Sequence, residues 1–244
     1  MEIIIADTYE ALSKKAAHDL LHLLQPLQQP LICTASGDTP AGLYRNLVQQ
    51  YGQQQFDPSQ WRFVGLDEWS GMNGTTEGSC RYYVDQQLFN PLEVEAQHIC
   101  FFDGTAENLE AECSRVEAFI QAQGGIEVAI LGLGLNGHVG MNEPGTSPFL
   151  HSHIAALDPE TQQVGQKYFK QPQQLSEGIT LGLATLLEAR HIFLLVSGRR
   201  KAEIVKKVIE ENPTENIPAT LLRDHPDFRL YLDAEAAHLL NGNS

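Results

Sequence analysis

The fold is decided by the segment Val128-Ala-Ile-Leu-Gly-Leu-Gly-Leu-Asn-Gly-His-Val-Gly-Met-Asn-Glu-Pro-Gly145. It begins with a short apolar run that predicts a buried strand, and closely spaced glycines then let the backbone turn sharply and approach a ligand. The loop also carries His138 and Glu143, with Asn136 and Asn142 beside them. A strand end, a glycine loop and an acid–base pair in one segment are typical of an active site.

Apolar runs alternate with helical periodicity on both sides of this segment. We predict strands over 3–6, 31–35, 62–66, 127–131, 192–196 and 228–232. We predict helices over 8–24, 78–88, 106–123, 201–210 and 234–240, and one more that begins with Thr39 as its cap. This alternation predicts an α/β fold with a doubly wound, mostly parallel sheet. A chain of 244 residues is long enough to build it as a single domain over 1–244.

The charge balance argues against nucleic-acid and membrane partners. The net charge is −15, whereas phosphate backbones and anionic lipids require a positive surface. The first residues lack the cationic region of a signal peptide, and no apolar run approaches the length of a membrane span. The cysteines form no C-x-x-C pair, so we expect reduced thiols, no metal site and a cytoplasmic protein.

Ligands bind such sheets at the carboxyl ends of the strands, and the first strand end of interest contains Ser36, Gly37 and Thr39. Hydroxyls and free N–H groups at a helix start can bind a phosphate. The alternative is that Thr39 only caps the helix. Asp38 is an unfavourable neighbour for an anion unless its carboxylate points away.

Three further strand ends carry titratable groups. Asp67 follows an apolar strand together with Glu68, and partial burial would suit it to act as a general base; the alternative is a solvated strand end. His138 with Glu143 forms a candidate acid–base unit, and the alternative is a structural histidine. Lys201 lies at a helix start and suits a phosphate, unless it is an exposed lysine of the basic run 199–201.

The glycines at 132, 134 and 137 also match the spacing of a dinucleotide-binding fingerprint. That fingerprint opens a long helix, whereas Asn142, Pro144 and Gly145 interrupt any helix here within two turns. We therefore predict a loop that carries reactive side chains, without a dinucleotide.

Four motifs together resemble the glucosamine-6-phosphate deaminase (isomerase) family, including its galactosamine-6-phosphate subgroup. They are Leu66-Asp-Glu-Trp69, the loop 131–145, Gly178-Ile-Thr-Leu-Gly-Leu183 and Ile217-Pro-Ala-Thr220. The related 6-phosphogluconolactonases typically continue the histidine motif with Thr-Ala-Ser-Leu-Phe-Pro, where this chain has Val139-Gly-Met-Asn-Glu-Pro144. The resemblance covers almost the whole chain and implies a modified Rossmann-like fold of the sugar-phosphate isomerase/deaminase type.

The resemblance also implies a reaction. Glucosamine 6-phosphate or galactosamine 6-phosphate would become the 2-keto hexose 6-phosphate plus ammonia, in amino sugar catabolism, with no metal or organic cofactor. His138 would open the sugar ring, Glu143 would orient it, and Asp67 would carry a proton between C2 and C1. Asn136, where some members have Asp, belongs with these catalytic residues. The phosphate would bind Ser36, Gly37, Thr39, Lys167 and Lys201.

This sequence departs from the family pattern at two positions of the phosphate site. Position 38 is usually a small residue and here is Asp, and Lys167 replaces an arginine, which keeps the charge but loses the bidentate fork. Two alternatives stay open: a 6-phosphogluconolactonase-type hydrolase, and a non-catalytic sugar-phosphate-binding homologue. Trp69, where glucosamine deaminases commonly have Tyr, favours galactosamine slightly. We expect a monomer or a small homo-oligomer.

Overall fold

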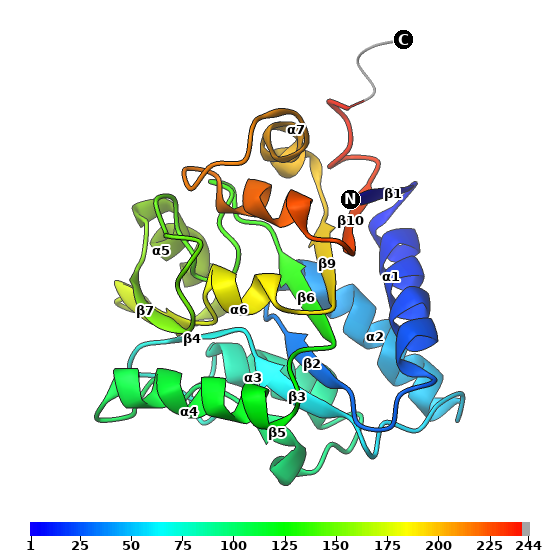
Figure 1. Cartoon of the computed structure of the whole chain (residues 1–244), viewed down its shortest axis with the longest axis vertical. Helices are drawn as coiled ribbons and strands as arrows, with labels where there is room; N and C mark the ends of the chain where they lie inside the picture. The colour runs from blue at the N-terminus through cyan, green and yellow to red at the C-terminus, as the bar shows by residue number, and fades with distance from the viewer. Residues whose placement is uncertain (241–244) are drawn as a thin grey trace.

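The computed structural model describes residues 1–240, and in them a sheet of seven parallel strands forms the centre of the molecule (Figure 1). The strand order is β1-β10-β9-β6-β2-β3-β5. The bounds are β1 (Glu2–Ala6), β2 (Leu31–Thr34), β3 (Arg62–Gly65), β5 (Ile99–Cys100), β6 (Val128–Gly132), β9 (His191–Val196) and β10 (Phe228–Asp233). The predicted α/β class with a doubly wound, mostly parallel sheet is confirmed.

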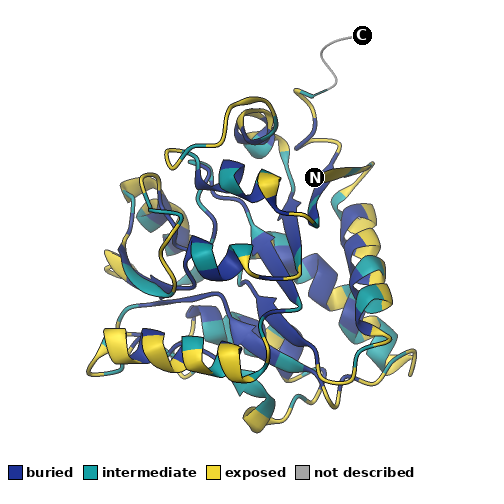
Figure 2. Ribbon diagram, viewed as in Figure 1, coloured by how far each residue is buried: buried dark blue, intermediate teal, exposed yellow. Residues whose placement is uncertain are grey.

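Helices cover both faces of this sheet. Successive side chains of each strand point to opposite faces, and apolar side chains on both faces have to be buried. In β2, Leu31 and Cys33 belong to the core under α4 (Leu109–Ala122) and α7 (Ala202–Glu210), whereas Ile32 belongs to the core under α1 (Tyr9–Leu24) and α2 (Asp38–Gly52). Figure 2 shows the inner strands of the central sheet buried and the outer faces of α1 and α4 exposed. The helices are α1 (Tyr9–Leu24), α2 (Asp38–Gly52), α3 (Cys80–Val84), α4 (Leu109–Ala122), α5 (Pro159–Gly165), α6 (Leu183–Leu187) and α7 (Ala202–Glu210).

A second, antiparallel sheet of three short strands lies beside the first. Its order is β4-β8-β7, from β4 (Asp67–Trp69), β8 (Glu177–Thr180) and β7 (His153–Ala156). The sequence predicts a strand over 62–66 that ends at Asp67-Glu68-Trp69. In the structure the chain leaves the central sheet at Leu66, and 67–69 form a strand of the second sheet. Asp67 then pairs with Thr180 of β8. Strands β7 and β8 escape prediction because they are short and carry no clear alternation.

Two helix predictions are wrong, the cap of α2 and the helix over 234–240. Helix α2 begins at Asp38, with Gly37 as its cap at φ 115° and no side-chain capping bond, so Thr39 does not cap it. The segment 234–240 forms turns and not a helix. Asp233 accepts the N–H of Ala236 at 2.7 Å and so stabilises a local turn.

The topology of the central sheet determines where a crevice opens. The chain passes from β2 to β3 in one direction across the sheet and from β6 toward β9 in the other. The loops after β2 and β6 therefore diverge, which leaves a crevice at the carboxyl ends of these two strands.

The four cysteines are buried and free. Within residues 1–240 no helix has the length and apolar character needed to cross a membrane.

Candidate active site

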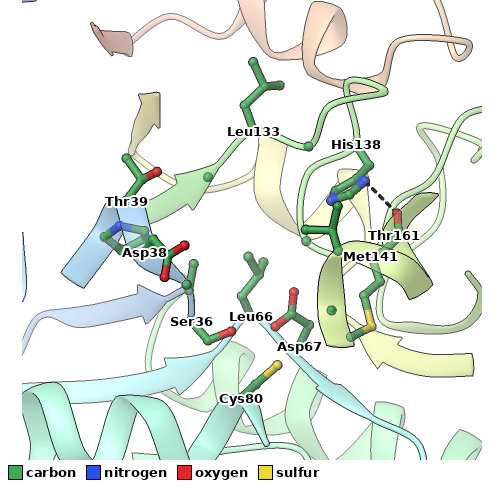
Figure 3. Close-up of a pocket in the computed structure, with 18 of the residues that line it drawn as sticks. Ser36, Asp38, Thr39, Leu66, Asp67, Cys80, Leu133, His138, Met141 and Thr161 are labelled. Atoms are coloured by element: carbon green, nitrogen blue, oxygen red, sulfur yellow. Dashed lines mark hydrogen bonds between the residues drawn. The ribbon is translucent and has the colours of Figure 1, made fainter. Parts of the chain in front are cut away.

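A cavity of about 400 Å³ opens at this crevice. Figure 3 shows Ser36, Asp38 and Thr39 on one wall, His138 and Thr161 on the opposite wall, and Asp67 between them. The structure thus brings together all four strand-end segments that the sequence singles out. The predicted site residues that line the cavity are Ser36, Gly37, Thr39, Asp67, His138, Lys167 and Lys201. Asn136 and Glu143 are not in its lining and contact His138 instead.

Asp67 and Glu68 are adjacent carboxylates that face opposite sides of β4. Asp67 is 8% exposed and lines the cavity. Burial raises its pKa to about 6, against the opposing effects of a contact with the Cys80 thiol and of the charge on His138. Asp67 is therefore ionised near neutral pH and is a stronger base than an exposed aspartate.

Glu68 is fully buried on the other side of the strand. Its carboxylate accepts the backbone N–H groups of Trp69, Cys80 and Arg81, each at 2.9 Å. Burial raises its pKa to about 7, although these hydrogen bonds act in the opposite direction. Glu68 thus ties the start of α3 to β4, and it does not take part in the cavity.

His138 is oriented by a cluster of polar side chains at the cavity wall. Its Nδ1 lies 3.4 Å from Glu143 Oε2 and 3.2 Å from Thr161 Oγ1. Asn136 donates to Glu143 at 2.8 Å, and its own side-chain oxygen accepts the backbone N–H of His138 at 3.1 Å. Burial raises the pKa of Glu143, but hydrogen bonding and the charge of His138 leave it below its ordinary value.

Gly134 allows the His138 ring to sit where it does. A Cβ at position 134 would lie 2.4 Å from the ring atoms Cε1 and Nδ1 of His138. No side chain fits there without displacing the imidazole. The loop after β6 continues through turns and a short bridge between Val139 and Asn142 without forming a helix, as predicted.

The opposite end of the cavity combines the start of α2 with two lysines. Gly37 begins α2 without a side-chain cap, and the Tyr9 hydroxyl donates to Asp38 O at 2.6 Å and accepts from Gly42 N at 2.7 Å. Lys201 Nζ donates to Leu133 O at 2.5 Å. Burial, together with the charge of Lys167, lowers the pKa of Lys201 to about 8. This lysine is thus not a simple exposed member of the basic run.

Lys167 is paired with a carboxylate from the neighbouring wall. Its Nζ lies 2.5 Å from Asp38 Oδ2, and it also lies 4.8 Å from the centre of the Tyr168 ring. Asp38 therefore does not point away from the predicted phosphate site. Its carboxylate forms an ion pair with one of the two lysines that the phosphate would need.

Several residues that line the cavity were not predicted as site residues, among them Cys80, Thr161 and Tyr168. Thr161 belongs to α5, whose start is marked by Asp158 as cap and Pro159 at its first position, and this Asp-Pro signal could have located the helix. No local pattern says which side chain of so short a helix faces a cavity. Among residues 1–240, no cluster of three or more His, Cys, Asp or Glu side chains is arranged to hold a metal ion.

Comparison with known proteins gives the family. The model of the family described as glucosamine-6-phosphate isomerases/6-phosphogluconolactonase matches residues 6–230. The chain belongs to this family. Among curated members of the glucosamine-6-phosphate isomerase/6-phosphogluconolactonase family, the glucosamine-6-phosphate deaminase of Geobacillus sp. (strain WCH70) is 36% identical over 98% of this chain and 96% of its own. That of Clostridium perfringens is 35% identical over 98% of this chain and 100% of its own.

Solved structures of the glucosamine-6-phosphate isomerase/6-phosphogluconolactonase family share the fold. A monomeric glucosamine-6-phosphate deaminase superimposes with a TM-score of 0.95 at 33% identity, over 98% of this chain and 100% of that one. The 6-phosphogluconolactonase of Trypanosoma brucei superimposes with a TM-score of 0.76 at 20% identity, over 98% of each chain. At that identity the second comparison speaks for the fold alone.

Proposed function

We propose that this protein is an isomerising deaminase that converts an amino sugar 6-phosphate to the 2-keto hexose 6-phosphate plus ammonia. One observation carries the proposal: a buried carboxylate, Asp67, faces the same cavity as His138 and two lysines. This arrangement supports a reaction in which a carbon base, a ring-opening group and phosphate ligands act on one small molecule. The relatives named glucosamine-6-phosphate deaminase support the same reaction.

The reaction divides between the two titratable side chains. His138 takes the proton of the C1 hydroxyl and returns it to the ring oxygen, which opens the ring to the aldehyde. Asp67 removes the C2 proton, which the adjacent carbonyl acidifies, and delivers it to C1. In the same step the C1 oxygen gains a proton and the C2 nitrogen loses one, so the aldehyde becomes a hydroxymethyl group and the amine becomes an imine. Water then adds to the imine carbon and expels ammonia. The proposed steps use no metal or organic cofactor.

The phosphate binds at the far end of the cavity. The hydroxyls of Ser36 and Thr39, the backbone at Gly37 and the start of the long helix α2 supply hydrogen bonds and a favourable dipole. Lys201, with a pKa of about 8, is protonated at neutral pH, and the phosphate charge stabilises that state. Lys167 adds a second cation when it leaves Asp38.

Two alternatives make different demands on these residues. A 6-phosphogluconolactonase would use His138 to activate water and would not need Asp67. A non-catalytic sugar-phosphate-binding protein would need neither group intact. The burial and raised pKa of Asp67 favour the deaminase, because they describe a base poised for proton transfer.

The finer assignment concerns the amino sugar. We favour galactosamine 6-phosphate over glucosamine 6-phosphate, since Trp69 lines the cavity where glucosamine deaminases commonly have Tyr. We also propose that residues 1–244 act as a single domain, in a monomer or small homo-oligomer, in line with the monomeric relative. Ammonia release from both amino sugar phosphates, measured side by side, tests the choice of substrate. Light scattering tests the oligomeric state.

The substitution Asp67→Asn tests the proposed function. We expect kcat for ammonia release to fall by about 10²–10⁴-fold, since the isosteric amide cannot accept the C2 proton, while KM changes by no more than about threefold. Exchange of the C2 proton with deuterated solvent should be lost in parallel. Ammonia release at the wild-type rate in this variant would refute the role of Asp67. Wild-type hydrolysis of 6-phosphogluconolactone without any ammonia release from either amino sugar would establish the lactonase instead.

A further inference from the structure

We propose that Thr161 is a positioning residue that holds His138 in the tautomer with the proton on Nδ1, so that the bare Nε2 faces the sugar. The proposal rests on the proposed function for its catalytic meaning, because the sugar hydroxyl is the group that Nε2 would meet. The placement of the proton is a property of the protein before any substrate binds.

The geometry at Nδ1 leaves one consistent pattern of donors. Thr161 Oγ1 lies 3.2 Å from His138 Nδ1 (Figure 3), and Glu143 Oε2 lies 3.4 Å from the same nitrogen. A carboxylate only accepts, whereas a hydroxyl can donate or accept. A proton on Nδ1 therefore suits both oxygens, and a lone pair of Thr161 Oγ1, the nearer of the two, accepts this N–H.

The opposite tautomer is disfavoured by Glu143 itself. With the proton on Nε2, the lone pair of Nδ1 would face Glu143 Oε2 at 3.4 Å. Figure 3 shows the second ring nitrogen of His138 turned toward the cavity. In the favoured tautomer this nitrogen is an acceptor, as the removal of a proton from the C1 hydroxyl requires.

The surroundings of Thr161 hold its hydroxyl in place. The residue is 8% exposed in α5, and Asp158 caps that helix by accepting the N–H of Glu160 at 2.8 Å. A β-branched side chain in a helix has restricted rotamers. Both the helix start and the side-chain shape thus direct one hydroxyl toward His138.

The chain contains a matched control outside the cavity. Thr185 in α6 donates to Glu117 at 2.7 Å and lies 3.1 Å from Nδ1 of His151. It likewise places a threonine hydroxyl against Nδ1 of a histidine that has a glutamate nearby, is also buried, and does not line the cavity. Loss of this hydroxyl costs stability in a similar way but changes nothing at His138.

The experiment compares Thr161→Val, Thr161→Ser and Thr185→Val. We expect Thr161→Val to lower kcat by about 10–100-fold with KM changed by less than about threefold, as for the loss of other groups that orient a reactive side chain. Thr161→Ser should restore kcat to within about threefold of wild type, because it keeps the hydroxyl. Thr185→Val should leave kcat and the pH profile unchanged.

Nitrogen NMR of the substrate-free protein reads the tautomer directly. We expect the His138 signals of the wild type to show the proton on Nδ1, and those of Thr161→Val to show a mixture. A wild-type proton on Nε2, or an unchanged tautomer and kcat in Thr161→Val, would overturn the proposal. If Thr161→Val does not fold, the wild-type tautomer and the Thr161→Ser variant still decide. Absence of ammonia release by the wild type would instead count against the proposed function alone.

Discussion

At the scale of single residues, direction within a strand separates the roles of two neighbouring carboxylates. Asp67 and Glu68 both have raised pKa values, about 6 and about 7, with burial as the main cause. The Glu68 carboxylate accepts three backbone N–H groups, whereas the Asp67 carboxylate remains available to a ligand. A perturbed pKa by itself therefore does not mark a catalytic group, and the cavity has to be considered with it.

Asp38 carries a prediction at the same scale. Its side chain is 76% exposed, so the pair with Lys167 adds little stability. Beside a bound phosphate, however, its negative charge is repulsive and it competes for a lysine. We expect Asp38→Asn to lower KM for the sugar phosphate by about 2–10-fold at low salt and to leave kcat unchanged, with a smaller effect at about 0.5 M salt because charges are screened.

Steady-state kinetics at two ionic strengths measures this effect of Asp38. Asp57→Asn is a suitable control, since Asp57 is another exposed carboxylate and does not line the cavity. An unchanged or higher KM in Asp38→Asn, relative to this control, would show that Asp38 does not oppose the phosphate.

At the scale of elements, the loop after β6 depends on a close contact between backbone and ring. We expect Gly134→Ala to displace His138, because the added Cβ would lie 2.4 Å from two of its ring atoms. Overpacking of this kind costs about 1–3 kcal/mol of stability, and a misplaced catalytic group can lose about 100-fold in rate. The expected result is a kcat lower by that order, measured together with the thermal midpoint.

The control for Gly134→Ala is Gly52→Ala. A Cβ at Gly52 meets no atom within 4 Å, and this glycine has no positive φ. It should therefore keep both activity and stability. Full activity in Gly134→Ala would mean that the His138 ring has another productive position.

At Leu66 the chain leaves the central sheet, although the sequence pattern gives no sign of a change. The apolar pattern runs on from 62 to 66, but the chain changes sheets there, and Asp67 pairs with Thr180 of a strand more than a hundred residues away. The element that carries the proposed base thus depends on β8, which the sequence does not indicate. Periodicity describes one strand at a time and contains nothing about its partner.

At the scale of the whole molecule, charge predicts an unusual dependence of stability on pH. The folded pKa values of Asp67 and Glu68 lie above their ordinary values, so the folded state binds protons more tightly than the unfolded chain. Their contribution to stability is present at low pH and is lost as the pH rises through about 6 and about 7. The net charge of −15 adds self-repulsion, which also weakens as the pH falls.

We therefore expect the Tm to rise when the pH falls from about 7.5 to about 6, by several degrees, since about 1 kcal/mol moves the Tm of a chain of this size by about 2–4 °C. Differential scanning calorimetry measures it. Asp67→Asn should reduce the dependence, because it removes one of the two groups, while Glu10→Gln on the exposed side of α1 should not. A Tm that falls over the same interval would contradict the assignment of these pKa shifts.

The sequence by itself determined the sheet, the reactive loop and the candidate base. Alternating apolar and helical segments are local patterns, and parallel strands place their carboxyl ends at one edge, so the sequence alone suffices to group Ser36, Asp67, His138 and Lys201. Only the tertiary structure decided which way each side chain points. The direction of Asp67, the contact of Thr161 with His138 and the pairing of Asp38 with Lys167, 129 positions apart, result from packing between distant elements. Local pattern does not encode such contacts, because they depend on how the helices and the second sheet are placed over the first.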